Sequence, residues 1–289
     1  MLNVETRRPV LERDGANTRS VRTLVEFSMD QVDRSLPAWA RRANPIVRRH
    51  LGAYWKTFTP DVSALVRIYG VLVAVTAVTI LVPLLYTLLV PTVTVSLVML
   101  PFGAYVYASV LYQVGAFAAG AAHRERRQAT LDVLRATPFR LRTILLSKGA
   151  AAVWRSIEDV NLVTLIALLT SLPLLLIVYH AALRPLESPL LVGLVVAAAL
   201  ASFTLRIFLE TALIAALGLL MGTVNATRSG AVLSTSLITL GYFGLINLAR
   251  LLPFGAGWLI VIELVLPLIL PILLAWLLLV LTARIIEAD

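Results

Sequence analysis

The sequence predicts an all-α integral membrane protein with six transmembrane helices, preceded by an amphipathic helix at the membrane interface. Of its 289 residues, 59% are hydrophobic and only 14% are charged, and the mean hydropathy is +0.89. A soluble domain cannot bury that much apolar surface, so lipid must be the solvent for most of the chain. The run from Ile68 to Ala122 contains no Asp, Glu, Lys or Arg, which is longer than one crossing requires.

The apolar runs divide into six segments, because one crossing takes about 20 residues. The polar cluster at 91–94 (Pro-Thr-Val-Thr) divides the first run in two. The fourth segment is long for one crossing and is expected to be tilted, kinked or extended beyond the bilayer. We predict spans at about 64–90, 95–121, 157–179, 190–221, 231–251 and 258–281.

The basic residues support this count. Twelve Lys and Arg lie between the N-terminus and Arg67, at the start of the first span, and eight lie between Arg124 and Arg155, so 20 of the 25 occupy two segments. With Arg228 and Arg284 one side holds 22, whereas the other holds two, Arg184 and Arg250. Positively charged connectors remain cytoplasmic, so we expect a multi-pass protein of the plasma (inner) membrane with both termini cytoplasmic. Attraction to lipid headgroups explains the charge better than nucleic acid, which is not an expected partner.

The region before the first span has two parts. Residues 1–43 form a cytoplasmic extension in which partial disorder is expected, and residues 44–289 form the six-span domain. Asn44 and Pro45 are suited to begin a helix, which we predict over 45–58. Its apolar residues recur on one face, so it is expected to lie in the headgroup region. The alternative is a short soluble helix packed on another domain. The apolar face comprises Val47, Leu51, Tyr54, Trp55 and Phe58.

Residues 123–148, HRERRQATLDVLRATPFRLRTILLSK, form a charged island between the second and third spans. Leu131 and Leu134 share one face of a short helix, which Pro138 ends because the residue before a proline is pushed out of the α region. A second helix is predicted over Phe139–Ser147, with Ile144–Leu146 leading back towards lipid. The segment is either a folded docking element or a solvated connector that only fixes topology.

The string from Glu125 to Leu134, ERRQATLDVL, followed by Ala-Thr-Pro at 136–138 and by Lys148, resembles the signature of type-2 ABC transporter permeases. Two positions depart from the family pattern, since His123 replaces an acidic residue and Ala129 replaces a glycine. With the six spans and the amphipathic helix, the resemblance covers roughly Asn44 to Glu287. In that family the segment is a cytoplasmic coupling-helix hairpin that receives motion from a separate ATP-hydrolysing subunit.

The resemblance implies a permease subunit that moves an unidentified substrate across the plasma membrane. Its partners would be an ABC ATP-binding subunit and a second permease copy or homologue. The implied coupling residues are Glu125, Arg126, Arg127, Thr130, Leu131, Leu134, Thr137 and Pro138.

The chain is not predicted to be an enzyme. Neither Lys56 nor Lys148, its only lysines, follows a phosphate-binding G-x-x-x-x-G-K-[ST] loop, so ATP and Mg would be bound by the partner subunit. No catalytic residues, metal site or cofactor of its own are expected, because cysteine is absent and the three histidines lie far apart in sequence.

Three groups of residues within or near the spans are further candidates. Arg206 and Glu210 lie one turn apart in the fourth span, either as a self-neutralised pair or in a substrate path. The second group, at the inner start of the third span, is expected to organise the junction with the charged island or to be an ordinary interfacial cluster: Arg155, Glu158 and Asp159. Gly218 and Gly222 form a G-x-x-x-G pair that favours close helix packing.

Two other functions remain compatible with the sequence. The first is a non-transporting membrane subunit that anchors or assembles a larger complex. The second is a secondary transporter, although the sequence has neither repeated halves nor paired broken helices.

Overall fold

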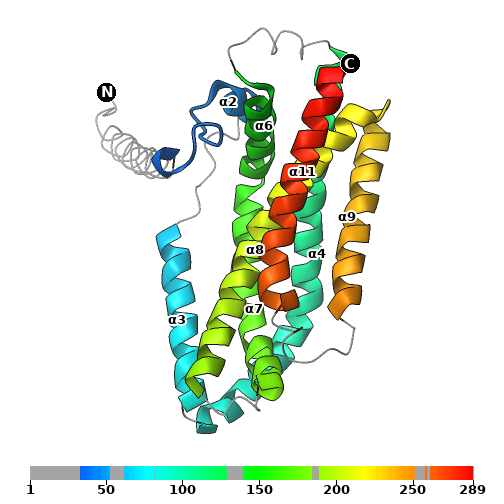
Figure 1. Cartoon of the computed structure of the whole chain (residues 1–289). Helices are drawn as coiled ribbons and strands as arrows, with labels where there is room; N and C mark the ends of the chain where they lie inside the picture. The colour runs from blue at the N-terminus through cyan, green and yellow to red at the C-terminus, as the bar shows by residue number, and fades with distance from the viewer. Residues whose placement is uncertain are drawn as a thin grey trace, which may run out of the picture.

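The computed structural model describes residues 33–52, 62–81, 83–128, 139–183, 189–250, 258 and 261–288. These residues are helical or lie in short connections. The first part of the chain forms α2 (Pro45–Leu51), α3 (Val62–Leu81), α4 (Pro83–Arg127) and α6 (Leu141–Arg155). The second part forms α7 (Ile157–Leu183), α8 (Pro189–Val224), α9 (Arg228–Arg250), the π-helix η2 (Val261–Val265) and α11 (Leu266–Ala288). The long helices run side by side in one elongated bundle (Figure 1).

Four helices are long and apolar enough to cross a membrane, which is the pattern of an integral membrane protein. Their spanning parts are Val93–Arg127, Gly193–Val224, Arg228–Ala249 and Val261–Ala288. The helices α3 and α7, with 20 and 27 residues, occupy the positions of the first and third predicted spans. The prediction of an all-helical membrane protein is therefore confirmed for the described part of the chain.

α8 is the central helix of the bundle. In its most apolar stretch 72% of the residues are buried, against 11% in α4 and α11 and 17% in α9. The outer helices therefore present most of their apolar surface to the surroundings, as helices in lipid do. The largest cluster of buried side chains joins α8 to α4 and α7 through small and β-branched residues, among them Ala118, Val160 and Ala215.

The G-x-x-x-G pair of α8 packs against α4 of the same chain. A Cβ atom added to Gly218 would lie 2.6 Å from the carbonyl oxygen of Gly115 and 2.9 Å from Cβ of Ala118. Gly222 faces the carbonyl oxygen of Ala119 in the same way. The absence of side chains at both glycines thus permits the close approach of the two backbones, as the spacing predicts.

The helices at the first two predicted spans do not divide at the polar cluster. α3 ends at Leu81 and α4 begins at Pro83, so residues 91–94 lie inside α4. The part of α4 that is apolar enough to span begins at Val93, close to the predicted start of the second span. Pro83 begins α4, where its missing N–H removes no helical hydrogen bond. Pro91 and Pro101 are accommodated within the helix, as membrane helices allow. The first turns of α4 run across the lower end of the bundle before the helix turns upward (Figure 1).

The amphipathic helix predicted over 45–58 is shorter in the structure, where α2 covers Pro45–Leu51. Asn44 caps α2, its Oδ1 accepting a hydrogen bond from the backbone N–H of Ile46 at 2.9 Å. The helix ends at Leu51, because Gly52 adopts a positive φ of 53°. Of the predicted apolar face, Val47 and Leu51 are buried against Ala151 and Trp154 of α6 and Ile157 of α7. These two residues therefore contact protein rather than headgroups. Tyr54, Trp55 and Phe58 lie outside the described residues.

A proline-rich joint begins the last helix. Pro267 has no N–H to donate to the carbonyl of Glu263, which would be its partner in an α-helix. The chain forms the wider turn of η2 at this point. The hydroxyl of Ser202, on α8, lies 3.1 Å from the carbonyl oxygens of both Glu263 and Leu264 and donates to them. A neighbouring helix thus helps to satisfy the backbone of this joint.

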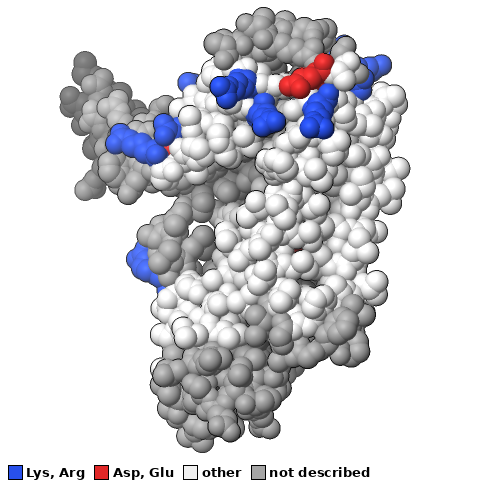
Figure 2. Space-filling view, viewed as in Figure 1, with Lys and Arg blue, Asp and Glu red and all other residues white. Residues whose placement is uncertain are grey.

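The basic side chains gather at one end of the molecule. In the visible face, most of the blue Lys and Arg lie over the upper end, where α2, α6 and the C-terminal end of α11 meet, and the flank of the bundle is largely uncharged (Figure 2). This end is called the charged end below. It includes the last turn of α4 and the first turn of α9, with Arg124, Arg127 and Arg228.

Candidate functional site

Glu125 is the centre of a buried cluster at the charged end. Its carboxylate forms an ion pair with Lys148 of α6, and Nε2 of His50, on α2, lies 3.2 Å from its Oε1. Only 6% of Glu125 and 3% of Lys148 are exposed to solvent. Three segments that are far apart in sequence therefore meet at one carboxylate. Glu125 therefore faces inward, towards α2 and α6.

The remaining described residues of the charged island extend from this cluster. Arg126 donates from Nη1 to the backbone carbonyl of Thr223, at the end of α8. Arg127 and Gln128 are exposed. The other predicted coupling residues, Thr130, Leu131, Leu134, Thr137 and Pro138, lie outside the described residues.

In the second half of the island the described residues begin with Phe139 and Arg140, which are both exposed. The following helix, α6, extends to Arg155 rather than to Ser147. The expectation that Ile144 and Leu145 lead towards lipid is wrong, since they are 1% and 2% exposed. Leu145 packs against Ala283 and Ile286 of α11. The apolar side of α6 is thus a packing surface for the bundle.

The segment before α2 is part of the same assembly. The indole Nε1 of Trp154 donates to the carbonyl of Ala40 at 2.8 Å, and the guanidinium of Arg42 stacks over the Trp154 ring at 4.7 Å. Burial lowers the pKa of Arg42, an effect that the neighbouring Asp33 opposes. Asn44 donates from Nδ2 to the Ser147 hydroxyl at 3.3 Å. Residues 33–43 therefore pack with the domain, although the sequence assigned them to the extension.

Arg155, Glu158 and Asp159 lie at the junction between α6 and α7. Ser156 alone separates the two helices. The guanidinium of Arg155 lies 4.7 Å from the centre of the Phe117 ring on α4, which ties the junction to the bundle. Glu158 and Asp159 are exposed in the first turn of α7, where negative charge interacts favourably with the helix dipole.

Arg206 and Glu210 form the ion pair that their spacing predicts, with 2.7 Å between Nε and Oε1. Two tyrosines complete the site: Tyr107 of α4 donates its hydroxyl to Oε2 of Glu210, and Tyr242 of α9 donates to Oε1 at 3.2 Å. Glu210 is 1% exposed, so its charge is balanced within the protein. The network joins α8 to α4 and to α9.

Sequence reasoning missed His50, Tyr107 and Tyr242. The two tyrosines carry hydroxyls inside apolar spans, which is a signal that a buried polar partner is needed. His50 offered no such signal, because only the folding of α2 onto α6 brings it to Glu125. Within the described ranges, no group of three or more potential ligands among His, Cys, Asp and Glu could hold a metal ion.

The comparisons with known proteins supply no relative. No family model matches the sequence, and no significant similarity to a curated protein or to a solved structure was found. The resemblance to type-2 ABC permeases therefore stays a prediction from the sequence motif between Glu125 and Lys148.

Proposed function

We propose that the chain is the permease subunit of an ATP-driven transporter in the plasma membrane. The single observation that carries the proposal is the buried Glu125–Lys148 pair, because it connects the first and last charged residues of the permease-like motif. It joins the end of α4 to α6, and α6 leads through Ser156 into α7. A force applied between these residues would therefore reach two long helices of the bundle.

The proposal includes six crossings, formed by α3, α4, α7, α8, α9 and α11, with the charged end in the cytoplasm. The clustering of Lys and Arg supports this orientation, since such residues remain on the cytoplasmic side. A separate subunit would bind ATP and Mg and would contact exposed residues that flank positions 129–138. A second permease copy or homologue would complete the transporter, and the substrate is left unassigned.

Crosslinking in native membranes tests the proposal. A photoreactive amino acid is placed at Phe139, which is 42% exposed and lies within the charged island. The matched control replaces Trp258, which is 38% exposed and lies beside Ala249 at the far end of α9. We expect a P-loop ATPase to be crosslinked from position 139 and not from position 258. Crosslinking at 139 to other membrane proteins, with no ATPase recovered, would contradict the proposal.

A second candidate is a membrane subunit that anchors a larger complex without transporting. The balanced Arg206–Glu210 network favours it, because these charges are occupied by Tyr107 and Tyr242 rather than directed into a path. The two functions differ in what co-purifies. An anchor would be recovered in a stable assembly without an ATPase, and its variants at Glu125 would change assembly rather than ATP hydrolysis.

A further inference from the structure

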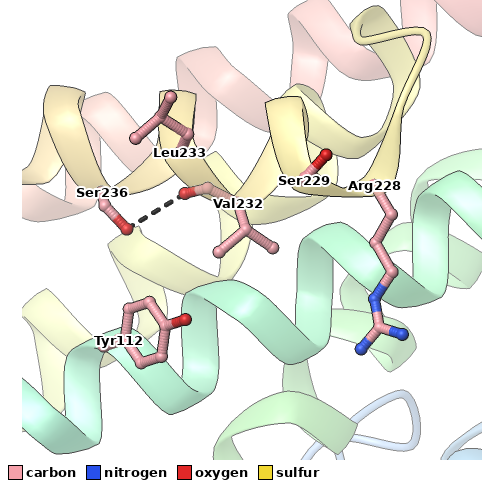
Figure 3. A pocket seen from close by; sticks show the side chains of 6 residues that line it. All are labelled: Tyr112, Arg228, Ser229, Val232, Leu233 and Ser236. Atoms are coloured by element: carbon pink, nitrogen blue, oxygen red, sulfur yellow. Dashed lines mark hydrogen bonds between the residues drawn. The ribbon is translucent and has the colours of Figure 1, made fainter.

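A groove runs between α4 and α9 from the charged end into the apolar flank. It consists of two adjoining cavities that share Arg228, with volumes of about 400 Å³ and 630 Å³. The smaller cavity is lined by basic residues and lies at the charged end. The larger continues along the two helices between Tyr112 and Leu233. In Figure 3 the ring of Tyr112, on α4, faces α9, and the guanidinium of Arg228 lies at one end of the groove.

The smaller cavity has the chemistry of an anion site. Its wall contains Arg124, Arg127 and Arg228 together with His123. Among the described residues, no carboxylate forms an ion pair with any of the three arginines. Arg124 uses Nε to bind the carbonyl of Gly120 at 3.2 Å, so its terminal amino groups remain for a ligand. Guanidinium groups match phosphate oxygens in geometry and charge.

Two further features indicate that the site is built around Arg228. A Cβ atom added to Gly120 would lie 3.2 Å from Nε of Arg228, so the glycine leaves room for the guanidinium against α4. His123 is 6% exposed, and its buried Nδ1 has no hydrogen-bond partner within the described part of the chain. A buried imidazole nitrogen without a partner, in the wall of a basic cavity, is a second and independent sign of a missing ligand.

The larger cavity suits a hydrocarbon chain. Val232 and Leu233 line it from α9, and Leu233 is 61% exposed. Three hydroxyl side chains also line it, those of Tyr112, Ser229 and Ser236. The hydroxyl of Ser236 is already donated to the carbonyl of Val232 at 3.0 Å (Figure 3). The groove therefore offers positive charge at one end and mainly apolar surface below it, at the level where apolar helices face lipid.

We propose that this groove binds an anionic phospholipid from the leaflet at the charged end. The phosphate contacts Arg124, Arg127 and Arg228, and one acyl chain lies along Tyr112, Val232 and Leu233. Membrane lipid is the occupant favoured by the order of the two cavities, since a soluble anion would make no use of the apolar one. The inference concerns a lipid-binding site and does not depend on the chain being a permease.

The test compares lipids and variants after the full-length protein has been reconstituted into lipid nanodiscs. Phosphatidylglycerol is titrated into phosphatidylcholine discs while thermal unfolding is followed, and native mass spectrometry counts the phosphatidylglycerol molecules retained. The variant is Arg127→Gln/Arg228→Gln, and the matched control is Arg284→Gln, an exposed arginine at the same end of the molecule on α11. Equal unfolding midpoints in pure phosphatidylcholine establish that all three proteins fold alike.

We expect the wild type and Arg284→Gln to retain phosphatidylglycerol and to gain thermal stability from it. The double variant should bind it about ten-fold more weakly or worse, because it loses two charge-assisted contacts. Equal binding by the double variant would overturn the proposal. An equal gain from phosphatidylcholine, or from inorganic phosphate in phosphatidylcholine discs, would overturn it as well. A gain from phosphatidylcholine would mean that the groove has no preference for a charged headgroup. A gain from inorganic phosphate would mean that the site takes a free anion rather than a lipid.

A third variant examines the apolar half. Ser236→Trp fills the larger cavity and leaves the arginines in place. Weaker retention of phosphatidylglycerol by this variant supports a bound acyl chain, whereas unchanged retention would exclude the α4–α9 groove as its location.

Discussion

Glu125 and Lys148 lie 23 positions apart and form a buried ion pair that holds the end of α4 against α6. His50 contacts the same carboxylate from α2. Removing one member of a buried pair is costly because it leaves an uncompensated charge away from water. One carboxylate therefore joins these three helices at the charged end.

Reversing one charge of this pair should destabilise the protein. Glu125→Lys and Lys148→Glu each place like charges together, and we expect each to lower the free energy of unfolding by about 3–5 kcal/mol. The double variant restores attraction and should recover part of the loss, limited by the contact between His50 and the new lysine. Thermal unfolding in detergent measures all three. Arg284→Glu, at an exposed position on α11, serves as the control and should change stability little.

Two results would contradict this account. The first is additivity, in which the double variant loses as much free energy of unfolding as the two single variants together. Residues in contact are expected to deviate from additivity. The second applies to the proposed function: single variants that insert normally yet leave the ATP hydrolysis of the partner subunit unchanged would separate the pair from any coupling.

Alanine at Gly218 should force α4 and α8 apart. The added methyl group would lie 2.6 Å from the carbonyl oxygen of Gly115, so the helices must shift, at a cost of about 1–3 kcal/mol. Gly241→Ala on α9 is the matched control, because nothing lies within 4 Å of its added Cβ. It should be neutral or slightly stabilising. Equal effects of the two substitutions, measured by unfolding in mixed micelles, would refute the close contact.

Loss of the Tyr107 hydroxyl should weaken the network around Glu210. Tyr107→Phe leaves one carboxylate oxygen without its donor, and we expect a loss of about 1–3 kcal/mol. Tyr105→Phe alters the same helix at a side chain that is 73% exposed and should have no effect. Glu210→Gln should cost more than Tyr107→Phe, because it also removes the charge that balances Arg206. The reverse order of these losses would count against the network.

The orientation of the bundle is testable because the chain has no cysteine. Single cysteines at Gln128, which is exposed beyond α4, and at Trp258, near the far end of α9, can be treated with a membrane-impermeant maleimide. On intact cells we expect labelling at 258 only, and on opened membranes at both positions. External labelling at 128 would place the charged end outside and make the proposed ATPase contact impossible.

The helices that composition alone defines were predicted well, because a long apolar run has few alternatives to a helix in lipid. α7 begins at Ile157 as predicted, and α8 extends over 36 residues, in agreement with the expectation of an unusually long fourth segment. The boundary between the first two helices was misplaced because the prediction relied on the polar residues and gave Pro83 no part in it. The polar residues at 91–94 do not interrupt a helix, whereas Pro83 is suited to begin one.

The contacts of the charged end were less predictable. The spacing of Arg206 and Glu210 within one helix fixes their pairing, because residues four apart share a face. No local rule brings His50 to Glu125 or Ala40 to Trp154, since these contacts follow from the packing of α2 and its preceding segment on α6. The direction of the α6 face was misjudged for the same reason: an apolar stripe is compatible with lipid and with protein, and only the fold distinguishes them.

The joint between η2 and α11 bears on the order in which the bundle assembles. Because Pro267 withholds an N–H and Ser202 of α8 donates to the carbonyls of Glu263 and Leu264, the C-terminal helix carries a backbone defect that a neighbour repairs. An inserted α11 not yet in contact with α8 keeps those carbonyls short of a donor inside hydrocarbon. Docking on α8 removes that penalty, so the final association step is favoured by the chemistry of the defect itself.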